Sequence, residues 1–118
     1  MSENIQELHD LVGEEISAVC FVRDYVEFYF DGPILRSLTN PTVVDHGASF
    51  LFPEPGSRDA LCRLIGSTVR GLEMEEARAL TLTMADDREI WIPLDGKNRR
   101  GQEALHFLPQ GVRSIQVW

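Results

Sequence analysis

The sequence predicts an α+β domain that is mostly antiparallel sheet, with about six or seven strands and two or three short helices. Two observations carry this prediction. Large apolar residues recur at every second position in residues 25–30, 80–85 and 90–94, which is the period of a strand with one buried face. Shorter segments between these strands carry apolar residues at helical spacing, which is typical of short amphipathic helices.

The first half of the chain begins with a predicted helix and continues as a meander of strands. Leu8 and Leu11 lie on one face of this helix, and Gly13 ends it. Asp31-Gly32 is the strongest hairpin signal in the sequence. The expected elements, in chain order, are a helix over 3–12 and strands over 14–22, 25–30 and 33–38, and residues 49–52 are a candidate for a further short strand.

The second half repeats this order of elements. Ser57 is the expected N-cap of a helix, because a serine hydroxyl can accept a hydrogen bond from the first turn. Gly66 ends this helix, and Asp86-Asp87 forms a turn between two strands. The expected elements are a helix over 57–65, strands over 69–74, 80–85 and 90–94, a short helix over 102–107 and a final strand over 112–118.

The two halves of the sequence are similar at a fixed offset. Gly13 and Gly66 lie 53 positions apart, and the strands that follow them match at nearly the same distance. The pattern predicts a single domain over residues 1–118 whose halves, 1–56 and 57–118, are related by an internal duplication (helix-β-β-β repeated). The alternative is that any helix followed by a meander of strands gives this spacing.

Charge and hydropathy limit the kinds of partner. The 118 residues carry 11 basic and 19 acidic side chains, so the net charge is -8. Phosphate binding needs clustered Lys and Arg, and the one basic run, residues 97–100, is interpreted as a solvated turn. We therefore expect no nucleic-acid partner. Because no apolar run approaches the roughly 18 residues that span a bilayer, we expect no membrane partner either.

The cysteines and the N-terminal sequence predict a cytoplasmic protein. Cys20 and Cys62 each lie in an apolar segment and have no metal-ligand or redox spacing. We expect them to be buried, reduced thiols rather than a disulfide. Residues 1–7 are polar and acidic, unlike a signal peptide.

Aromatic residues on the polar side of two strands are the best candidates for an interface. Tyr25 and Tyr29 flank Glu27, and Trp91 lies between two apolar residues of another strand. Two explanations stay open. Short helices cover this second face of the sheet, or the face binds a second copy of the chain or another protein, because Tyr and Trp are enriched at interfaces.

Few residues suggest catalysis, and we assign none as catalytic, metal-binding or cofactor-binding. Asp45-His46 lies in an irregular loop, where a histidine beside a carboxylate suits a general base or a ligand site. No nucleophile motif accompanies this pair, so a surface histidine is the competing interpretation. Glu103 and His106 share one face of the expected helix, but a single such pair does not make a metal site.

Several segments resemble small bacterial proteins of unassigned function. They are residues 24–32, residues 61–66, Gln102-Glu103-Ala104 and the terminal Trp118. The resemblance implies a compact bacterial domain of the cytoplasm and carries over no catalytic residue.

The missing catalytic motif, the net charge and the exposed aromatics favour a non-enzymatic interaction protein. Such a protein would form a homodimer or bind another protein, without a cofactor. One alternative is a small ligand-binding or enzymatic domain that uses Asp45 and His46. Another is an acidic inhibitor or immunity-type partner of a basic protein, which would fit the net charge of -8.

Overall fold

Ten strands form two antiparallel sheets in the computed structural model, which describes residues 7–110 and 115–118. The strand order is β1-β2-β3-β9-β10 in the first sheet and β5-β4-β8-β7-β6 in the second. The first sheet contains β1 (Ala18–Val22), β2 (Tyr25–Tyr29), β3 (Ile34–Ser37), β9 (Leu105–Leu108) and β10 (Gln116–Val117). The second contains β4 (Thr42–Asp45), β5 (Ala48–Leu51), β6 (Val69–Glu75), β7 (Ala79–Met84) and β8 (Glu89–Pro93). The helical elements are the 3-10 helix η1 (His9–Leu11) and the α-helix α2 (Ser57–Cys62).

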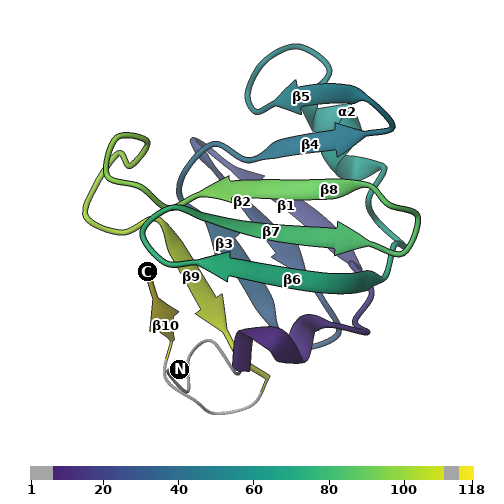
Figure 1. Ribbon diagram of the computed structural model, residues 1–118, viewed down its shortest axis with the longest axis horizontal. Coiled ribbons are helices and arrows are strands. Elements are labelled where there is room, and N and C mark those ends of the chain that lie inside the picture. The colour runs from purple at the N-terminus through teal and green to yellow at the C-terminus, as the bar shows by residue number, and fades with distance from the viewer. Residues whose placement is uncertain (1–6, 111–114) are drawn as a thin grey trace.

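The two sheets pack face to face, and their strands cross one another (Figure 1). Alternate residues of each strand point into the space between the sheets, as the period of two in the sequence requires. Among the fully buried side chains of the first sheet are Phe28, Leu35 and Phe107, and Leu82 and Ile90 are among those of the second. Burial of each such side chain stabilises the fold by about 1.5–3 kcal/mol, so this layer is the main source of stability.

This architecture shows that the predicted α+β class is wrong. The described residues contain ten strands rather than six or seven, and one short α-helix in place of two or three. The molecule is mostly β. The strands with clean alternation were predicted correctly, and the errors lie in the short segments between them.

No helix forms over residues 102–107, because residues 102–104 are irregular and residues 105–107 belong to strand β9. Leu105 and Phe107 are buried and alternate with half-buried His106 and Leu108, which is the period of a strand. The segment pairs with the open edge of β3, where Arg36 stands opposite His106. Backbone pairing with an existing sheet edge outweighs a weak helical spacing over so few residues.

The other two predicted helices end earlier in the chain than expected. The prediction for residues 3–12 falls partly outside the described residues, and the part that is described ends as η1 before Gly13. In the second half, α2 ends at Cys62 instead of residue 65. The N-cap is Gly56, with φ of 86°, and no side chain caps the helix. Ser57 is instead the first helical residue, and Cys62 is exposed at the last one, so both expectations for these residues are wrong.

Strand β4 was not predicted, because Asn40-Pro41 interrupts the alternation of the sequence. It pairs with β8 on one side and with β5 on the other. The hairpin between β4 and β5 turns through His46 and Gly47, whose φ angles are 49° and 93°. Left-handed angles at both positions are those of a tight two-residue hairpin turn, which follows the twist of the strands.

The two halves of the chain meet in a reciprocal set of backbone hydrogen bonds. Gly13 donates its N–H to the carbonyl of Val69, and Gly66 donates to that of Ile16, each at 2.8 Å. Glu15 and Thr68 form an antiparallel bridge between these bonds. Exchanging residues that lie 53 positions apart turns each bond into the other. The local geometry therefore has two-fold character, and an origin by duplication stays a prediction.

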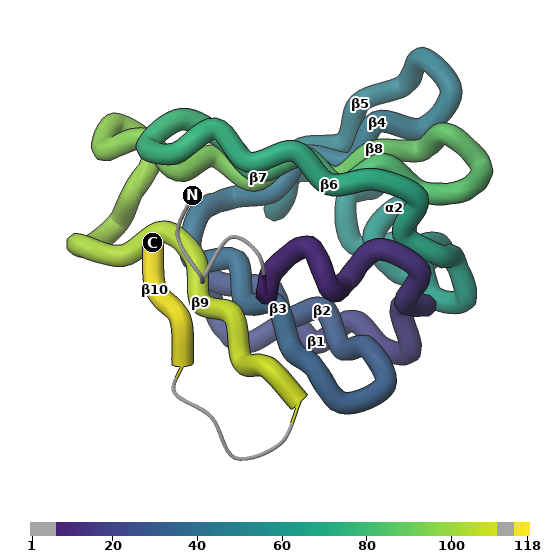
Figure 2. The backbone as a smooth tube through the Cα atoms, turned by 60° about the horizontal axis from the view of Figure 1, so that its bottom comes forward, coloured from purple at the N-terminus to yellow at the C-terminus, as the bar shows by residue number. Residues whose placement is uncertain are grey.

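Each half completes the sheet of the other half. Strand β4 follows β3 in the chain but pairs with β8, whereas β9 follows β8 and pairs with β3. The two short helical elements lie at the open edges between the layers (Figure 2). α2 contacts β1, β4 and β5, and η1 contacts β6. Neither contact places a helix over the outer face of the first sheet.

Candidate functional site

The outer face of the first sheet carries a row of side chains that crosses all five strands. Strand register places these residues opposite one another in turn, and we call them the ionic row: Cys20, Glu27, Arg36, His106 and Val117. Its three central members are ionisable, which is unusual for neighbouring positions at the middle of a sheet. The row is therefore the first place to look for a function.

Glu27 is buried although it lies on the outward side of β2, and only 6% of its surface is exposed. Arg36 donates from Nε to Glu27 Oε2 at 2.7 Å, and Tyr29 donates its hydroxyl to Glu27 Oε1 at 2.9 Å. The guanidinium of Arg36 also lies 5.8 Å from the centre of the Tyr25 ring. Two donors and an aromatic ring thus compensate for the loss of water around the carboxylate.

The Glu27 carboxylate also changes the chemistry of Tyr29. The hydrogen bond to Glu27 and the negative charge of Glu27 raise the pKa of the Tyr29 phenol above its ordinary value. The bond is lost when the phenol deprotonates, because a phenolate has no proton to donate. Tyr29 is therefore held in its neutral, donating form.

His106 extends the network from Arg36 to Glu103. Arg36 Nη1 lies 3.0 Å from His106 Nδ1, and His106 Nε2 lies 2.7 Å from Glu103 Oε1. Because a guanidinium can only donate, Nδ1 must be the acceptor, which assigns the proton of the neutral ring to Nε2. His106 therefore donates to Glu103, and one continuous chain of hydrogen bonds joins Glu103 to Glu27.

The outer face of the second sheet provides an internal comparison. Register there gives an equivalent row: Glu73, Thr81, Trp91, Thr42 and Leu51. Its first three residues lie 53–55 positions after Cys20, Glu27 and Arg36 of the ionic row. Thr81 stands where the first sheet has Glu27, and Trp91 stands where it has Arg36. The same meander folds without an ionic network, so the ionic row is not a requirement of the fold.

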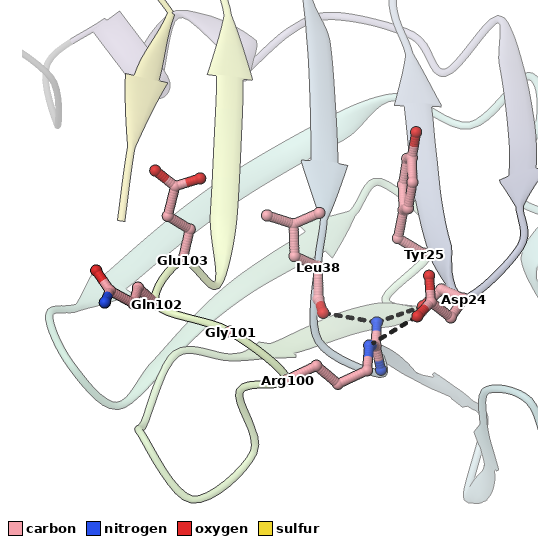
Figure 3. Close-up of a pocket in the computed structure, with 7 residues that line it drawn as sticks. All are labelled: Asp24, Tyr25, Leu38, Arg100, Gly101, Gln102 and Glu103. Carbon is pink, nitrogen blue, oxygen red and sulfur yellow. Dashed lines mark hydrogen bonds and ion pairs between the residues drawn. The ribbon is translucent and has the colours of Figure 1, made fainter.

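A pocket of about 410 Å³ opens beside the ionic row, next to the ends of β2, β3 and β9 (Figure 3). Leu38 lies between its two sides, with Tyr25 on one side and Gln102 and Glu103 on the other. Glu103 belongs to both the pocket and the hydrogen-bond network. The pocket thus joins an aromatic wall and an apolar surface to a carboxylate that is already oriented by His106.

The basic run at residues 97–100 lies in a turn and is largely exposed, and its two arginines also hydrogen bond to neighbouring segments. Arg100 donates from Nη1 to Asn40 Oδ1 at 2.8 Å and from Nη2 to the carbonyls of Asp24 and Leu38. Its Nε lies 3.5 Å from Asp24 Oδ2. Arg99 donates to the carbonyls of Leu94 and Gln102. These donors tie the loop to the end of the first sheet.

The structure brings together two of the three predicted interface residues. Tyr25 and Tyr29 lie on the outer face of the first sheet, on either side of Glu27. Trp91 lies on the outer face of the second sheet, 48% exposed, with its indole N–H donated to Glu89 at 2.9 Å. The tyrosines and the tryptophan are therefore parts of different surfaces.

Asp45 and His46 lie at the end of the β4–β5 hairpin, away from the ionic row. Their side chains approach to 3.7 Å, and the His46 side chain is 66% exposed. Arg63 lies 4.0 Å from the other oxygen of Asp45. The pocket beside the ionic row includes neither residue, and their assignment to a ligand or catalytic loop stays a prediction.

Metal-ligand geometry gives no further site. Within residues 7–110 and 115–118, no cluster of three or more His, Cys, Asp or Glu side chains is arranged to hold a metal ion.

In the same part of the chain, no helix is both long and apolar enough to cross a bilayer.

Glu27 and Arg36 were not selected from the sequence as functional residues. The available signal was a charged residue between two tyrosines in a strand whose other face is fully apolar. Such a carboxylate at the centre of a sheet needs a cation from a neighbouring strand. Arg36 could not be assigned to that role before the register of β2 and β3 was known.

Comparisons with family models, with curated proteins and with solved structures give no match to this chain. The resemblance to small bacterial proteins therefore stays a prediction.

Proposed function

We propose that this chain is a non-enzymatic protein-interaction domain that binds its partner through the outer face of the sheet β1-β2-β3-β9-β10. The observation that carries the proposal is the ionic row, with Tyr25 and Tyr29 beside it. Arg36, Tyr25 and Tyr29 are half-buried and held in place before any partner arrives. Tyrosine and arginine are the residue types that contribute most at protein interfaces.

Preorganisation of these side chains supports an interaction role. A long side chain that is fixed on binding costs about 0.5–1.5 kcal/mol of conformational entropy. Arg36 is already held by Glu27 and His106, and Tyr29 is held by Glu27. Much of this cost is therefore met in the folded state, which favours tight and specific association.

We further propose that the domain works in the cytoplasm. Both cysteines are free, and Cys62 is exposed. An exposed, unpaired thiol suits a reducing compartment better than an oxidising one.

A pair of matched substitutions tests the interaction surface. Tyr29→Lys places a cation on the proposed surface, and Thr83→Lys makes the same change of charge at the equivalent position of the other sheet, 54 residues later. Tagged wild type and both variants are recovered from the source cells and weighed by native mass spectrometry. We expect wild type and Thr83→Lys to carry the same second copy or partner protein, and Tyr29→Lys to lose it while still unfolding in one cooperative urea transition.

Three results would overturn the proposal. The first is retention of the partner by Tyr29→Lys, and the second is its equal loss from both variants. The third is recovery of the wild type as a bare monomer at every salt concentration tried.

A further inference from the structure

The pocket beside the ionic row has the size and composition of a binding site for one side chain of a partner. Its volume of about 410 Å³ falls within the usual range of ligand pockets, roughly 300–1,000 Å³. Figure 3 shows the Tyr25 ring on one side, Glu103 on the other and Leu38 between them. A ligand that fits must combine an apolar or planar part with a group that pairs with a carboxylate.

The charge in this pocket is negative once its internal pairs are counted. Asp24 and Arg100 compensate each other, because Arg100 Nε lies 3.5 Å from Asp24 Oδ2. The Nη atoms of Arg100 donate to Asn40, Asp24 and Leu38, so the guanidinium is engaged by oxygens of its own chain. Within residues 7–110 and 115–118, His106 is the one hydrogen-bond partner of Glu103, and that ring is neutral in the tautomer assigned above. Glu103 is therefore the uncompensated charge.

Glu103 is also held in position as an acceptor. His106 Nε2 donates to one of its oxygens at 2.7 Å, and His106 is fixed in turn by Arg36. A carboxylate has about four acceptor sites, and this bond uses one of them. The remaining sites are available to a cation that enters the pocket.

We propose that this pocket binds an arginine side chain of a basic partner protein. The guanidinium pairs with Glu103 and lies against the Tyr25 ring, and its methylene groups pass over Leu38. A planar guanidinium satisfies a carboxylate with two parallel bonds and stacks on an aromatic ring, which a lysine ammonium does less well. The net charge of -8 adds a long-range attraction for such a partner. This inference rests on the proposed interaction function and names the chemistry of its partner.

The test uses a defined probe and does not require the partner. Nα-acetyl-arginine amide is titrated into the full chain labelled with ¹⁵N, and amide chemical shifts are followed. Nα-acetyl-citrulline amide is the control ligand, because citrulline has nearly the same shape without the charge. We expect saturable shifts confined to residues 24–25, 38 and 101–103 with the arginine probe, at a dissociation constant of about 1 mM. The citrulline probe should give none, and the corresponding lysine derivative should bind more weakly.

Two variants separate a specific pocket from general electrostatic attraction. Glu103→Gln keeps an acceptor for His106 and removes the charge, and should weaken the arginine probe about tenfold. Glu73→Gln removes one exposed charge from the outer face of the other sheet and should leave the affinity unchanged.

The inference is overturned if citrulline binds as well as arginine, if lysine binds more tightly, or if Glu103→Gln binds like the wild type. An equal loss of affinity in Glu73→Gln would also overturn it, since the attraction would then be unspecific. Failure of the probe, together with loss of the partner by Tyr29→Lys, would remove the arginine pocket and leave the interaction surface standing. The reverse pair of results would remove the proposed function and leave a cation pocket.

Discussion

Arg36→Met should reveal how much of the stability of the first sheet depends on the ionic row. The substitution keeps a long, unbranched side chain on β3 and removes the cation that meets Glu27 at 2.7 Å. Glu27 then keeps one donor, the hydroxyl of Tyr29. The Glu27 side chain is only 9% exposed, so its buried carboxylate would be left without a counter-charge.

The size of the effect follows from burial. Removing one partner of a fully buried ion pair costs about 3–5 kcal/mol. The Arg36 side chain is 23% exposed, so water can reach the site and replace part of the lost interaction. The bond to Tyr29 also persists. We therefore expect a loss of about 2 kcal/mol in the free energy of unfolding, near the value for one charge-assisted hydrogen bond.

Urea unfolding at neutral pH measures this loss. With a slope of about 1–3 kcal/mol per molar urea, the midpoint should fall by roughly 1 M. Trp91→Met is the matched control, because Trp91 occupies the equivalent position on the other sheet and is 48% exposed. It should cost less than about 1 kcal/mol, as exposed positions generally do.

A double variant completes the argument. Glu27→Met combined with Arg36→Met replaces the whole pair with apolar side chains and leaves no buried charge, so it should be more stable than Arg36→Met alone. The reasoning is refuted if the double variant is less stable than Arg36→Met. It is equally refuted if Arg36→Met costs no more than Trp91→Met.

Two further predictions concern a proton and a pair of glycines. In a variant whose other tyrosine is phenylalanine, absorbance at 295 nm should give a titration midpoint for Tyr29 above the ordinary value of about 10, and Glu27→Gln should return it toward that value. Because the pKa of Tyr29 is raised in the folded state, the stability that its bond to Glu27 contributes is complete below pH 10 and is lost as the pH rises through the folded-state pKa. A titration midpoint at or below 10 would contradict this prediction. Gly13→Ala and Gly66→Ala should each lower the free energy of unfolding by about 1–2 kcal/mol, because the φ angles of 94° and 92° are left-handed. No described atom lies within 4 Å of the added methyl group, so the cost comes from the backbone conformation alone. Thermal melts measure these losses. Gly71→Ala is the control and should cost nothing, because Gly71 has no left-handed φ and has equal room for a methyl group. Unequal losses at Gly13 and Gly66 would argue against their equivalence.

The sequence was informative wherever one face of a strand was apolar. Val26, Phe28 and Phe30 alternate with polar residues, and the structure buries all three. The turns at Asp31-Gly32 and Asp86-Asp87 were also predicted, and the left-handed backbone angles at Gly32 and Asp87 confirm them. These features are local, and local sequence determines them.

What could not be predicted depends on contacts between distant segments. β9 contains four residues whose apolar spacing fits a short helix as well as a strand, and the free edge of β3 decides between them. The partner of Glu27 likewise depends on register, which places Arg36 beside it and His106 one strand further. Tyr25 and Tyr29 could be found because aromatic residues stand out on a polar face, whereas an ion pair across strands has no signature in one strand alone.

The exchange of strands between the two halves affects how the chain can acquire its structure. A fragment covering residues 1–56 contains β1, β2 and β3 but lacks β9, which completes that sheet, and it carries β4 and β5 without their neighbour β8. The fragment covering residues 57–118 has the converse deficiency. Each fragment is thus a template for the other, and two such pieces mixed together should assemble where either alone would expose an unpaired strand edge. In the intact chain the same arrangement couples the two layers, so that opening one sheet removes strands from the other and the molecule should unfold as one cooperative unit.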